Sequence, residues 1–191
     1  MTDHTVTNLE SYVIAFCAPV FVGIKPACLF SLNINKCLNL DEEIATLNNV
    51  LSEKGVCIRR ACDHDNHVLI FVYRPLMLKK RLFRDDIKNY LIQEGYSIDK
   101  GFDAILLQLF DRLKKQPSFP HEIGVFLGYP LEDVLGFVKY RGRNCKMFGY
   151  WKVYGNKQKA QKLFAQYDRC KRELIDLYKQ GVSFLQLCNA S

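Results

Sequence analysis

A β-hairpin pattern in the N-terminal half limits most strongly what this chain can fold into. Two runs rich in β-branched and aromatic residues, 56–62 and 68–73, are separated by the turn-rich Asp63-His64-Asp65-Asn66. Runs of this kind joined by a short polar turn form antiparallel strands, and Pro75 ends the second one because proline cannot donate to a sheet ladder. The pattern therefore predicts an antiparallel sheet.

Three other segments have strand character. The stretch "YVIAFCAPVFVGIKPACLFSL", residues 12–32, is β-branched and aromatic and is broken by Pro19, Gly23 and Pro26, which predicts one or two buried strands joined by a tight turn. "KMFGYWKVYG", residues 146–155, alternates in a way that predicts a strand. The tail "VSFLQLC" is expected to add an edge strand or to pack against the core.

Helical spacing of apolar residues marks the remaining segments. "NLDEEIATLNNVLSEKG", residues 39–55, has acids in its first turn and a glycine after its last, as an amphipathic helix does. Further helices are expected over 76–92, from about Phe102 to Lys114 before Pro117, and from a capping Asn156 to about Lys179. Helices grouped around hairpin strands favour the α+β class, with a small, mostly antiparallel sheet packed with several helices.

The chain is long enough to bury a core, with 191 residues of which 49% are hydrophobic. We expect a single domain over 1–191, with an N-terminal α/β part over about 1–98, a helical part over about 101–140, and a strand plus long helix over about 144–180. No apolar run reaches the roughly 18 residues that cross a bilayer, and residues 1–10 lack the basic residues of a signal peptide. The sequence therefore predicts a cytoplasmic protein with no membrane segment.

Eight cysteines are spread along the chain, and none forms a C-x-x-C pair. In a chain without a signal peptide they are expected to be reduced thiols, most of them small buried apolar residues. Cys62, His64 and His67, with Cys57 before them, could bind zinc, but the same stretch has the composition of a polar hairpin turn. We assign no metal ligand and no cofactor from the sequence.

The stretch "HEIGVFLGYPLEDVLGF", residues 121–137, has the spacing of a helix-turn-helix. Gly124, Gly128 and Val134 occupy the positions where such a unit needs close packing, which predicts a helix-turn-helix-like corner at 120–139. A DNA-reading helix contacts bases with its N-terminal residues, and here those include Glu132 and Asp133, which would repel phosphates. The surface chemistry therefore favours a structural corner over a DNA reader.

Four stretches of the chain resemble one family over nearly its whole length: "CAPVFVGIKPACLFSL", "VYRPLML", "SFPHEIGVFLGYPLEDVLGFV" and "GYWKVYG". The family is an uncharacterised one of small soluble bacterial proteins from anaerobes, described only as a domain of unknown function. The resemblance implies a single cytoplasmic domain and carries no activity.

The net charge of +7 is concentrated near the C-terminus, where residues 139–172 contain eleven basic residues and one acid, Asp168. This asymmetry suggests a nucleic acid, a phosphorylated ligand or an acidic protein surface as partner, although a solvated basic face has the same composition. Aromatic residues interleaved with the cations could stack on bases. The nucleic-acid contacts would come from Arg141, Arg143, Lys146, Tyr150, Lys152 and Lys157.

A second hypothesis is a binding module for a small anionic ligand or an acidic partner. Lys25 lies between a glycine and a proline, Arg74 ends a predicted strand, and His121 precedes a predicted helix, so all three cations sit at turns or element ends. Cys17, Glu122 and Trp151 complete the candidate ligand-binding residues.

A third hypothesis is an enzyme that uses His121 and Glu122 as acid and base, or Cys17 as nucleophile. The zinc-protease pattern is absent because Val125 stands where a second histidine would be required. No reaction, oligomeric state or ligand identity follows from the sequence.

Overall fold

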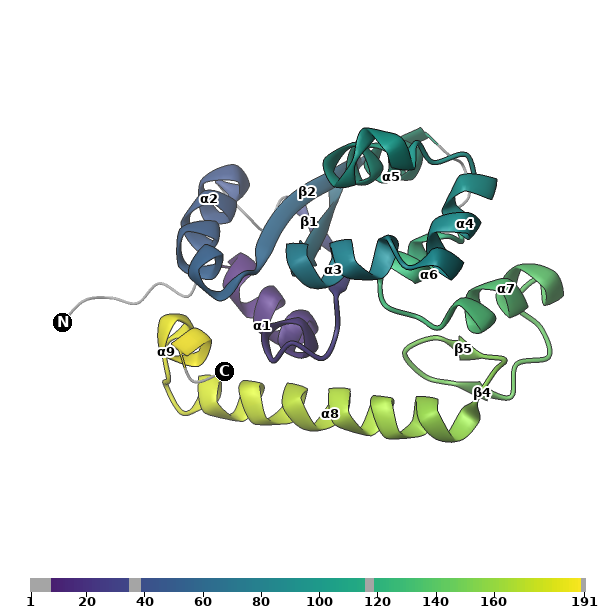
Figure 1. The fold of residues 1–191 in the computed structure, drawn as a ribbon. Coiled ribbons are helices and arrows are strands. Elements are labelled where there is room, and N and C mark those ends of the chain that lie inside the picture. The colour runs from purple at the N-terminus through teal and green to yellow at the C-terminus, as the bar shows by residue number, and fades with distance from the viewer. Residues whose placement is uncertain (1–7, 35–38, 116–118, 190–191) are drawn as a thin grey trace. The chain divides into compact units, whose positions relative to one another are not determined.

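The computed structural model describes residues 8–34, 39–115 and 119–189, and the chain forms two compact units (Figure 1). The first unit contains residues 1–75 and 167–191, and the second contains residues 76–166. Cys37, Pro117 and the side chain of Cys188 lie outside the described residues.

The first unit contains a three-stranded antiparallel sheet in the order β1-β3-β2. Its strands are β1 (Ala27–Asn33), β2 (Cys57–His64) and β3 (His67–Tyr73), and the β2–β3 pair is the hairpin that the sequence predicted. The register of β2 against β3 shifts between Arg60 and Cys62, which marks a β-bulge. The α+β class and the small antiparallel sheet are confirmed.

The segment predicted to start with a strand begins as a helix. α1 spans Asn8–Phe21 and contains Pro19, and only β1 is extended. The prediction of a strand before residue 22 is wrong because α1 lacks a polar face, and a helix that is apolar all round gives no helical period to detect. Its buried residues include Leu9, Val13, Ile14, Cys17, Ala18 and Val20.

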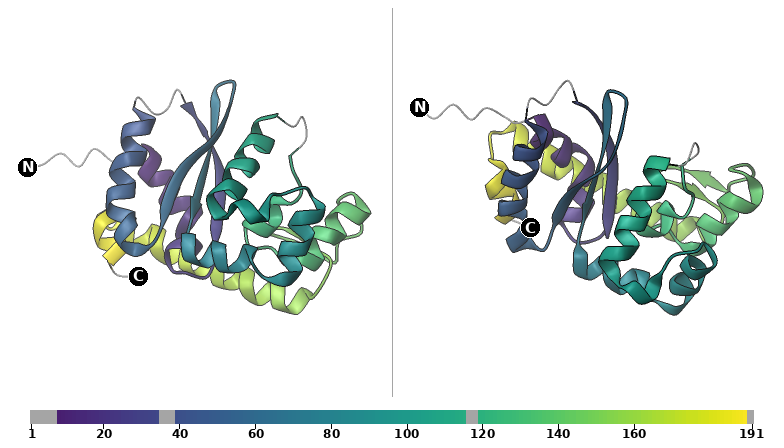
Figure 2. Two further views of the ribbon diagram at one scale, coloured as in Figure 1. Left: turned by 45° about the horizontal axis from the view of Figure 1, so that its top comes forward. Right: turned by 90° about the horizontal axis from the view of Figure 1, so that it is seen from above.

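Helices α1, α2 (Leu40–Leu51) and α9 (Phe184–Asn189) lie on one face of this sheet (Figure 2). Together with Cys170 and Leu174 of α8 they form a single apolar core against the alternate residues of the strands. α2 is the amphipathic helix expected from its spacing, and it is followed by the short helix η2 (Ser52–Lys54). The tail forms α9, so the expected edge strand is wrong and the alternative, packing against the core, is confirmed.

The second unit starts with helices α3 (Pro75–Leu82), α4 (Asp85–Gln93) and α5 (Phe102–Lys115), with the single turn η3 (Ile98–Lys100) before α5. The helix predicted over 76–92 is two helices. Arg84 is extended, with φ −66° and ψ 140°, and α4 restarts with two acids, which favour a helix N-terminus. The helix predicted from Phe102 is confirmed.

The rest of the second unit is a helical corner followed by a small hairpin. α6 (Ile123–Phe126) and α7 (Leu131–Tyr140) are the two short helices predicted at 120–139. The strand predicted over 146–155 is wrong: β4 (Met147–Phe148) and β5 (Lys152–Val153) pair with each other as a hairpin.

The long helix α8 (Lys157–Lys179) begins in the second unit and ends in the first. Its predicted cap is present, because the backbone N–H of Lys159 donates to Asn156 Oδ1 at 2.9 Å. Within the described residues, no helix is both long and apolar enough to cross a membrane.

Candidate functional site

The corner between α6 and α7 is packed too closely for any residue but glycine at position 124. A Cβ atom there would lie 2.7 Å from Val134 Cγ2 and 3.1 Å from the Tyr129 ring. Gly128 has φ +89°, the left-handed region that glycine adopts without strain. Arg81 of α3 holds the turn by donating from Nε to the carbonyl of Val125 at 2.7 Å and from its guanidinium to that of Tyr129. The predicted glycine packing is present, and Arg81 is a contributor that the sequence did not reveal.

Asp133, in the first turn of α7, joins the corner to the hairpin. Its side chain is buried, and Oδ2 accepts the indole N–H of Trp151 at 2.7 Å. Oδ1 accepts the backbone N–H groups of Tyr154 and Gly155, each at 2.7 Å. The sequence argument placed Glu132 and Asp133 together on the surface; Glu132 is exposed, but Asp133 is internal.

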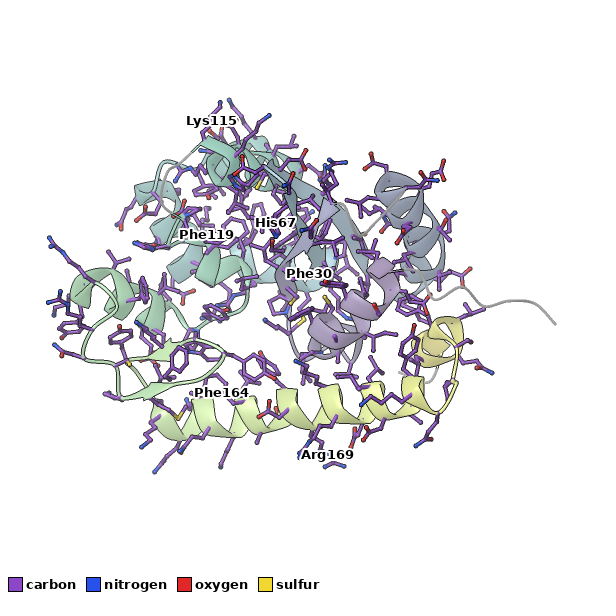
Figure 3. The ribbon with its side chains drawn as sticks, turned by 180° about the vertical axis from the view of Figure 1, so that it is seen from behind. Phe30, His67, Lys115, Phe119, Phe164 and Arg169 are labelled. Atoms are coloured by element: carbon purple, nitrogen blue, oxygen red, sulfur yellow. The ribbon has the colours of Figure 1, made fainter. Side chains whose placement is uncertain are left out.

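Aromatic side chains surround the bond between Asp133 and Trp151. The Trp151 ring stacks on Tyr129 with 4.8 Å between centroids and meets Phe164 of α8 edge-on at 4.5 Å. Phe164 projects from α8 toward the β4–β5 hairpin (Figure 3), where a Cβ on Gly149 would lie 2.3 Å from its ring. Offset and edge-on aromatic pairs fix ring orientation as well as burying area, so this wall is rigidly built.

A pocket of about 470 Å³ opens between the corner and the hairpin, within the second unit. Its lining is mainly apolar, and the basic nitrogen atoms in it come from His121 and Lys152. The His121 ring lies edge-on to Phe137 at 5.1 Å, and Lys152 Nζ lies 5.7 Å from the same ring while donating to the carbonyl of Gly142 at 2.8 Å. The lining residues are Phe119, Pro120, His121, Ile123, Gly124, Tyr129, Asp133, Val134, Phe137, Phe148, Gly149, Tyr150, Trp151 and Lys152.

The model of the family described as "Protein of unknown function (DUF3793)" matches residues 13–188, which includes the whole pocket and nearly all of both units. The chain belongs to this family. No curated protein and no solved structure matched the sequence.

Of the ligand-binding residues predicted for this DUF3793 protein, His121 and Trp151 line the same pocket. Lys25 and Arg74 belong to the first unit, so the three predicted cations are divided between the units. The corner and hairpin residues Tyr129, Phe137 and Lys152 join His121 and Trp151 instead. The sequence predicts Lys152 only as a contact to nucleic acid. No rule of residue spacing predicts that the corner packs against a hairpin ten or more residues later in the chain.

Arg74 has a structural task in the first unit. Its Nε donates to the carbonyl of Val20 at 2.5 Å, and its Nη1 donates to the carbonyl of Lys54 at 2.9 Å. Its Nη2 donates to the carbonyl of Phe21. Carbonyl groups in the last turn of a helix have no intrahelical donor, so Arg74 caps α1. Burial lowers the pKa of Arg74 from its ordinary value.

Glu122 of the DUF3793 chain belongs to an internal ion pair. Its Oε1 accepts from Arg112 at 2.8 Å and from the Tyr96 hydroxyl at 3.1 Å, and the Arg112 guanidinium lies over the Tyr96 ring at 4.3 Å. Burial, with the charge of Glu122, raises the pKa of Tyr96 well above its ordinary value. His121 lines the pocket and Glu122 does not, so the structure does not bring this predicted acid–base pair together there.

Cys17 is buried in the first unit, and burial is the main cause that raises the pKa of its thiol. In the hairpin turn, Cys62 Sγ and His64 Nε2 lie 3.5 Å apart. Across the part of the chain that the structure describes, no three His, Cys, Asp or Glu side chains converge as a metal site would require.

The predicted nucleic-acid residues lie around the hairpin. Lys152 and Tyr150 line the pocket. The other four are exposed to solvent and are close to the pocket residues in sequence. Arg141 ends α7 in the left-handed conformation with φ 51°, and the turn continues through Asn144 at φ 57° to the hairpin. The exposed members are Arg141, Arg143, Lys146 and Lys157.

Proposed function

We propose that the protein binds a small anionic ligand with a flat apolar part in the pocket between the α6–α7 corner and the β4–β5 hairpin. The observation that carries the proposal is an aromatic pocket of about 470 Å³ with two basic side chains in its lining. Sites for small molecules have this size and character, with apolar walls and a few polar groups that fix orientation.

The walls suit a flat molecule because they offer ring faces and edges. Trp151 is held between the Tyr129 stack and the Phe164 edge, so its position does not depend on a ligand. Asp133 fixes the indole from the other side. A pocket that is built before binding spends little free energy on ordering its side chains.

Lys152 and His121 supply the anion preference. An ammonium group has three N–H donors, and Lys152 Nζ uses one on the carbonyl of Gly142. The remaining donors can reach a carboxylate, sulfonate or phosphate, and His121 adds a ring nitrogen on the same lining.

The test uses 8-anilinonaphthalene-1-sulfonate, an aromatic anion with a flat naphthalene ring, as the probe. Trp151 is the single tryptophan of the chain, so binding in the pocket should quench its emission and transfer energy to the probe with one probe bound per chain. An unchanged near-ultraviolet circular dichroism spectrum should show that the protein stays native during the titration.

A matched pair of lysines on the hairpin provides the control. Lys152→Met should weaken probe binding about tenfold, the usual effect of losing a charge-assisted hydrogen bond. Lys146→Met should leave binding unchanged, because Lys146 also donates to a glycine carbonyl, that of Gly155 at 2.9 Å, but does not line the pocket. Equal losses in the two variants, or binding without quenching of Trp151, would exclude this site.

A second candidate function is binding of single-stranded nucleic acid along the same hairpin. It is supported by the exposed cations Arg141, Arg143, Lys146 and Lys157, by a sequence without acids between Asp133 and Asp168, and by Phe148, which is 75% exposed. Exposed aromatic rings stack on bases while cations contact phosphates.

Fluorescence anisotropy of a labelled oligothymidylate tests this second function. Affinity should fall steeply with salt, and Arg141→Gln with Arg143→Gln should reduce the slope by about 0.7 for each phosphate that the protein no longer neutralises. Arg169→Gln is the control, because Arg169 is exposed but already paired with Glu173 at 2.9 Å. No anisotropy change at low salt would reject this function.

A further inference from the structure

Two cysteines meet in the core of the first unit, where the end of α1 packs on the start of β1. Cys28 Sγ lies 3.2 Å from the carbonyl oxygen of Phe16, whose carbonyl carbon is bonded to the nitrogen of Cys17. The two thiols lie close enough for each to shift the pKa of the other through a side-chain hydrogen bond. Neither is in a disulfide, so the structure holds the pair in its reduced form.

The turn after α1 brings a cation to this pair. Gly23 adopts φ +73°, and the carbonyl of Pro19 accepts the backbone N–H groups of both Ile24 and Lys25 at 3.0 Å. The chain therefore folds back on the helix end, which leaves the Lys25 side chain buried with its amine 5.8 Å from the Tyr167 ring. Its charge acts on both thiols.

The two thiols are electrostatically unequal. The hydrogen bond from Cys17, with the charges of Lys25 and Lys171, lowers the pKa of Cys28 to about 7 against the opposing effect of burial. Burial and the neighbouring Cys28 raise the pKa of Cys17. Cys28 is therefore the nucleophile of the pair, because the thiolate is the reactive form, and Cys17 keeps its proton.

Exposure distinguishes the same residue. Cys28 is 7% exposed, whereas Cys17 is fully buried, so a small oxidant reaches Cys28 first. The half-buried Cys57 has its pKa raised by burial, and burial also raises the pKa of Cys170. Among the cysteines with described side chains, Cys28 combines a lowered pKa with a second thiol in contact.

We propose that Cys28 and Cys17 form a peroxide-reactive dithiol that closes to a disulfide between α1 and β1. The Cys28 thiolate attacks one oxygen of hydrogen peroxide, the O–O bond breaks, and the departing hydroxide takes a proton to become water. Cys28 is then a sulfenic acid. The sulfur of Cys17 attacks the sulfur of Cys28, the S–O bond breaks, and the hydroxyl leaves as water with the Cys17 proton. Two thiols are oxidised to one disulfide, and one peroxide is reduced to two waters.

The experiment exposes the full chain to stoichiometric hydrogen peroxide at pH 7, blocks remaining thiols, and maps peptides by mass spectrometry. A Cys17–Cys28 linked peptide should appear before Cys57 or Cys145 is modified. In Cys17→Ser, dimedone should trap the sulfenic acid on Cys28. Cys57→Ser is the matched control and should form the same linked peptide at the wild-type rate.

Two results would overturn the proposal. One is faster oxidation of Cys57 or Cys145 than of Cys28, and the other is a linked pair other than Cys17 with Cys28. Lys25→Met provides a variant that keeps both sulfurs in case a cysteine variant fails to fold. It should give the same product at least about threefold more slowly, because less Cys28 is thiolate at pH 7. An unchanged rate would remove Lys25 from the mechanism and contradict the electrostatic basis of the proposal.

Discussion

Each unit uses a charged side chain to hold backbone groups, a half-buried arginine in the first and a buried aspartate in the second. In the first unit, the Arg74 guanidinium is turned inward and donates to the carbonyls at the end of α1. In the second, the Asp133 carboxylate is turned inward and accepts N–H groups from the hairpin. Each charge bonds to backbone groups of another element, so each joins two elements.

The difference lies in what surrounds the joint. Arg74 is half-buried and lies against the carbonyl groups of Val20, Phe21 and Lys54. Asp133 instead fixes the wall of an open pocket whose lining contains two basic residues, His121 and Lys152. A charged side chain that is fully engaged with backbone groups therefore has a structural role. A ligand is expected at the neighbouring basic groups, His121 and Lys152, instead. Substitutions of the structural residues should therefore change stability, by amounts that depend on how many buried backbone groups lose a partner.

Asp133→Asn should have the largest effect on stability. An amide has one oxygen, so if that oxygen keeps the N–H groups of Tyr154 and Gly155, the amide nitrogen must face the Trp151 N–H, and two donors meet. Loss of a charged acceptor from buried donors should lower the free energy of unfolding by about 3 kcal/mol, measured by urea unfolding followed by Trp151 fluorescence.

Glu132→Gln is the matched control for that change. Glu132 is exposed and accepts a single bond from the Asn156 backbone at 3.3 Å, so its substitution should cost less than about 0.5 kcal/mol. Equal effects of the two substitutions would show that Asp133 does not hold the hairpin.

Arg74→Met should be the next most damaging change, and it acts on the first unit. The apolar chain keeps the packing, but three carbonyl groups lose the Arg74 donor and only that of Val20 keeps another, the Gly23 N–H, so the free energy of unfolding should fall by about 2 kcal/mol. Arg74→Lys should recover only part of this loss because an ammonium cannot match the planar fork of a guanidinium. Hydrogen exchange should show the loss of protection in α1 and β3. Protection as in the wild type would show that Arg74, unlike Asp133, does not hold backbone groups in place.

The sequence predicted the elements whose residues alternate between apolar and polar faces. Helices α2, α5 and the capped α8 have such faces. The β2–β3 hairpin was instead predictable from its β-branched runs and polar turn, and the corner from its glycine spacing. α1 was missed because residues 12–21 are apolar on every face, even where Phe16 is exposed, and the β4–β5 hairpin was missed because each strand is only two residues long.

The site was predictable only in part. His121 and Trp151 were candidates, and they share the pocket. Asp133 was interpreted as a surface acid, because a single acid in a helix's first turn has the same pattern whether it faces solvent or backbone N–H groups. Lys25 and Arg74 are residues of the type that binds anions. The sequence does not show that Arg74 already bonds to carbonyl groups, which the structure does.

Gly136→Ala tests the contact between α7 and the hairpin in the second unit. A Cβ at position 136 would lie 2.5 Å from Tyr154 Cβ, and the backbone of Tyr154 is held by Asp133. The clash should outweigh the helix propensity that alanine gains and lower the free energy of unfolding by about 1 kcal/mol.

Gly155→Ala is its counterpart, because the atoms it meets belong to the exposed, flexible end of Glu132, at 2.1 Å. That side chain can swing into solvent, so the cost in thermal or urea unfolding should stay below about 0.5 kcal/mol. A larger cost for Gly155→Ala than for Gly136→Ala would show that the close approach of Gly136 to Tyr154 does not hold α7 against the hairpin.

Arg60→Met should have the smallest effect on stability. It removes an arginine that pairs with surface carboxylates, for comparison with Arg74, which bonds to backbone carbonyl groups. Arg60 is on β2, next to the strand that ends before Arg74, and it pairs with Asp63 at 2.8 Å and Asp41 at 3.1 Å at the surface. Both carboxylates remain hydrated when the arginine is removed, so the loss should be about 0.5 kcal/mol and should shrink in high salt. The Arg74→Met loss should not respond to salt, because the guanidinium there meets carbonyl dipoles rather than charges. A salt-sensitive loss at Arg74, or an equal loss at Arg60, would show that charge pairing and not the capping of α1 stabilises this unit.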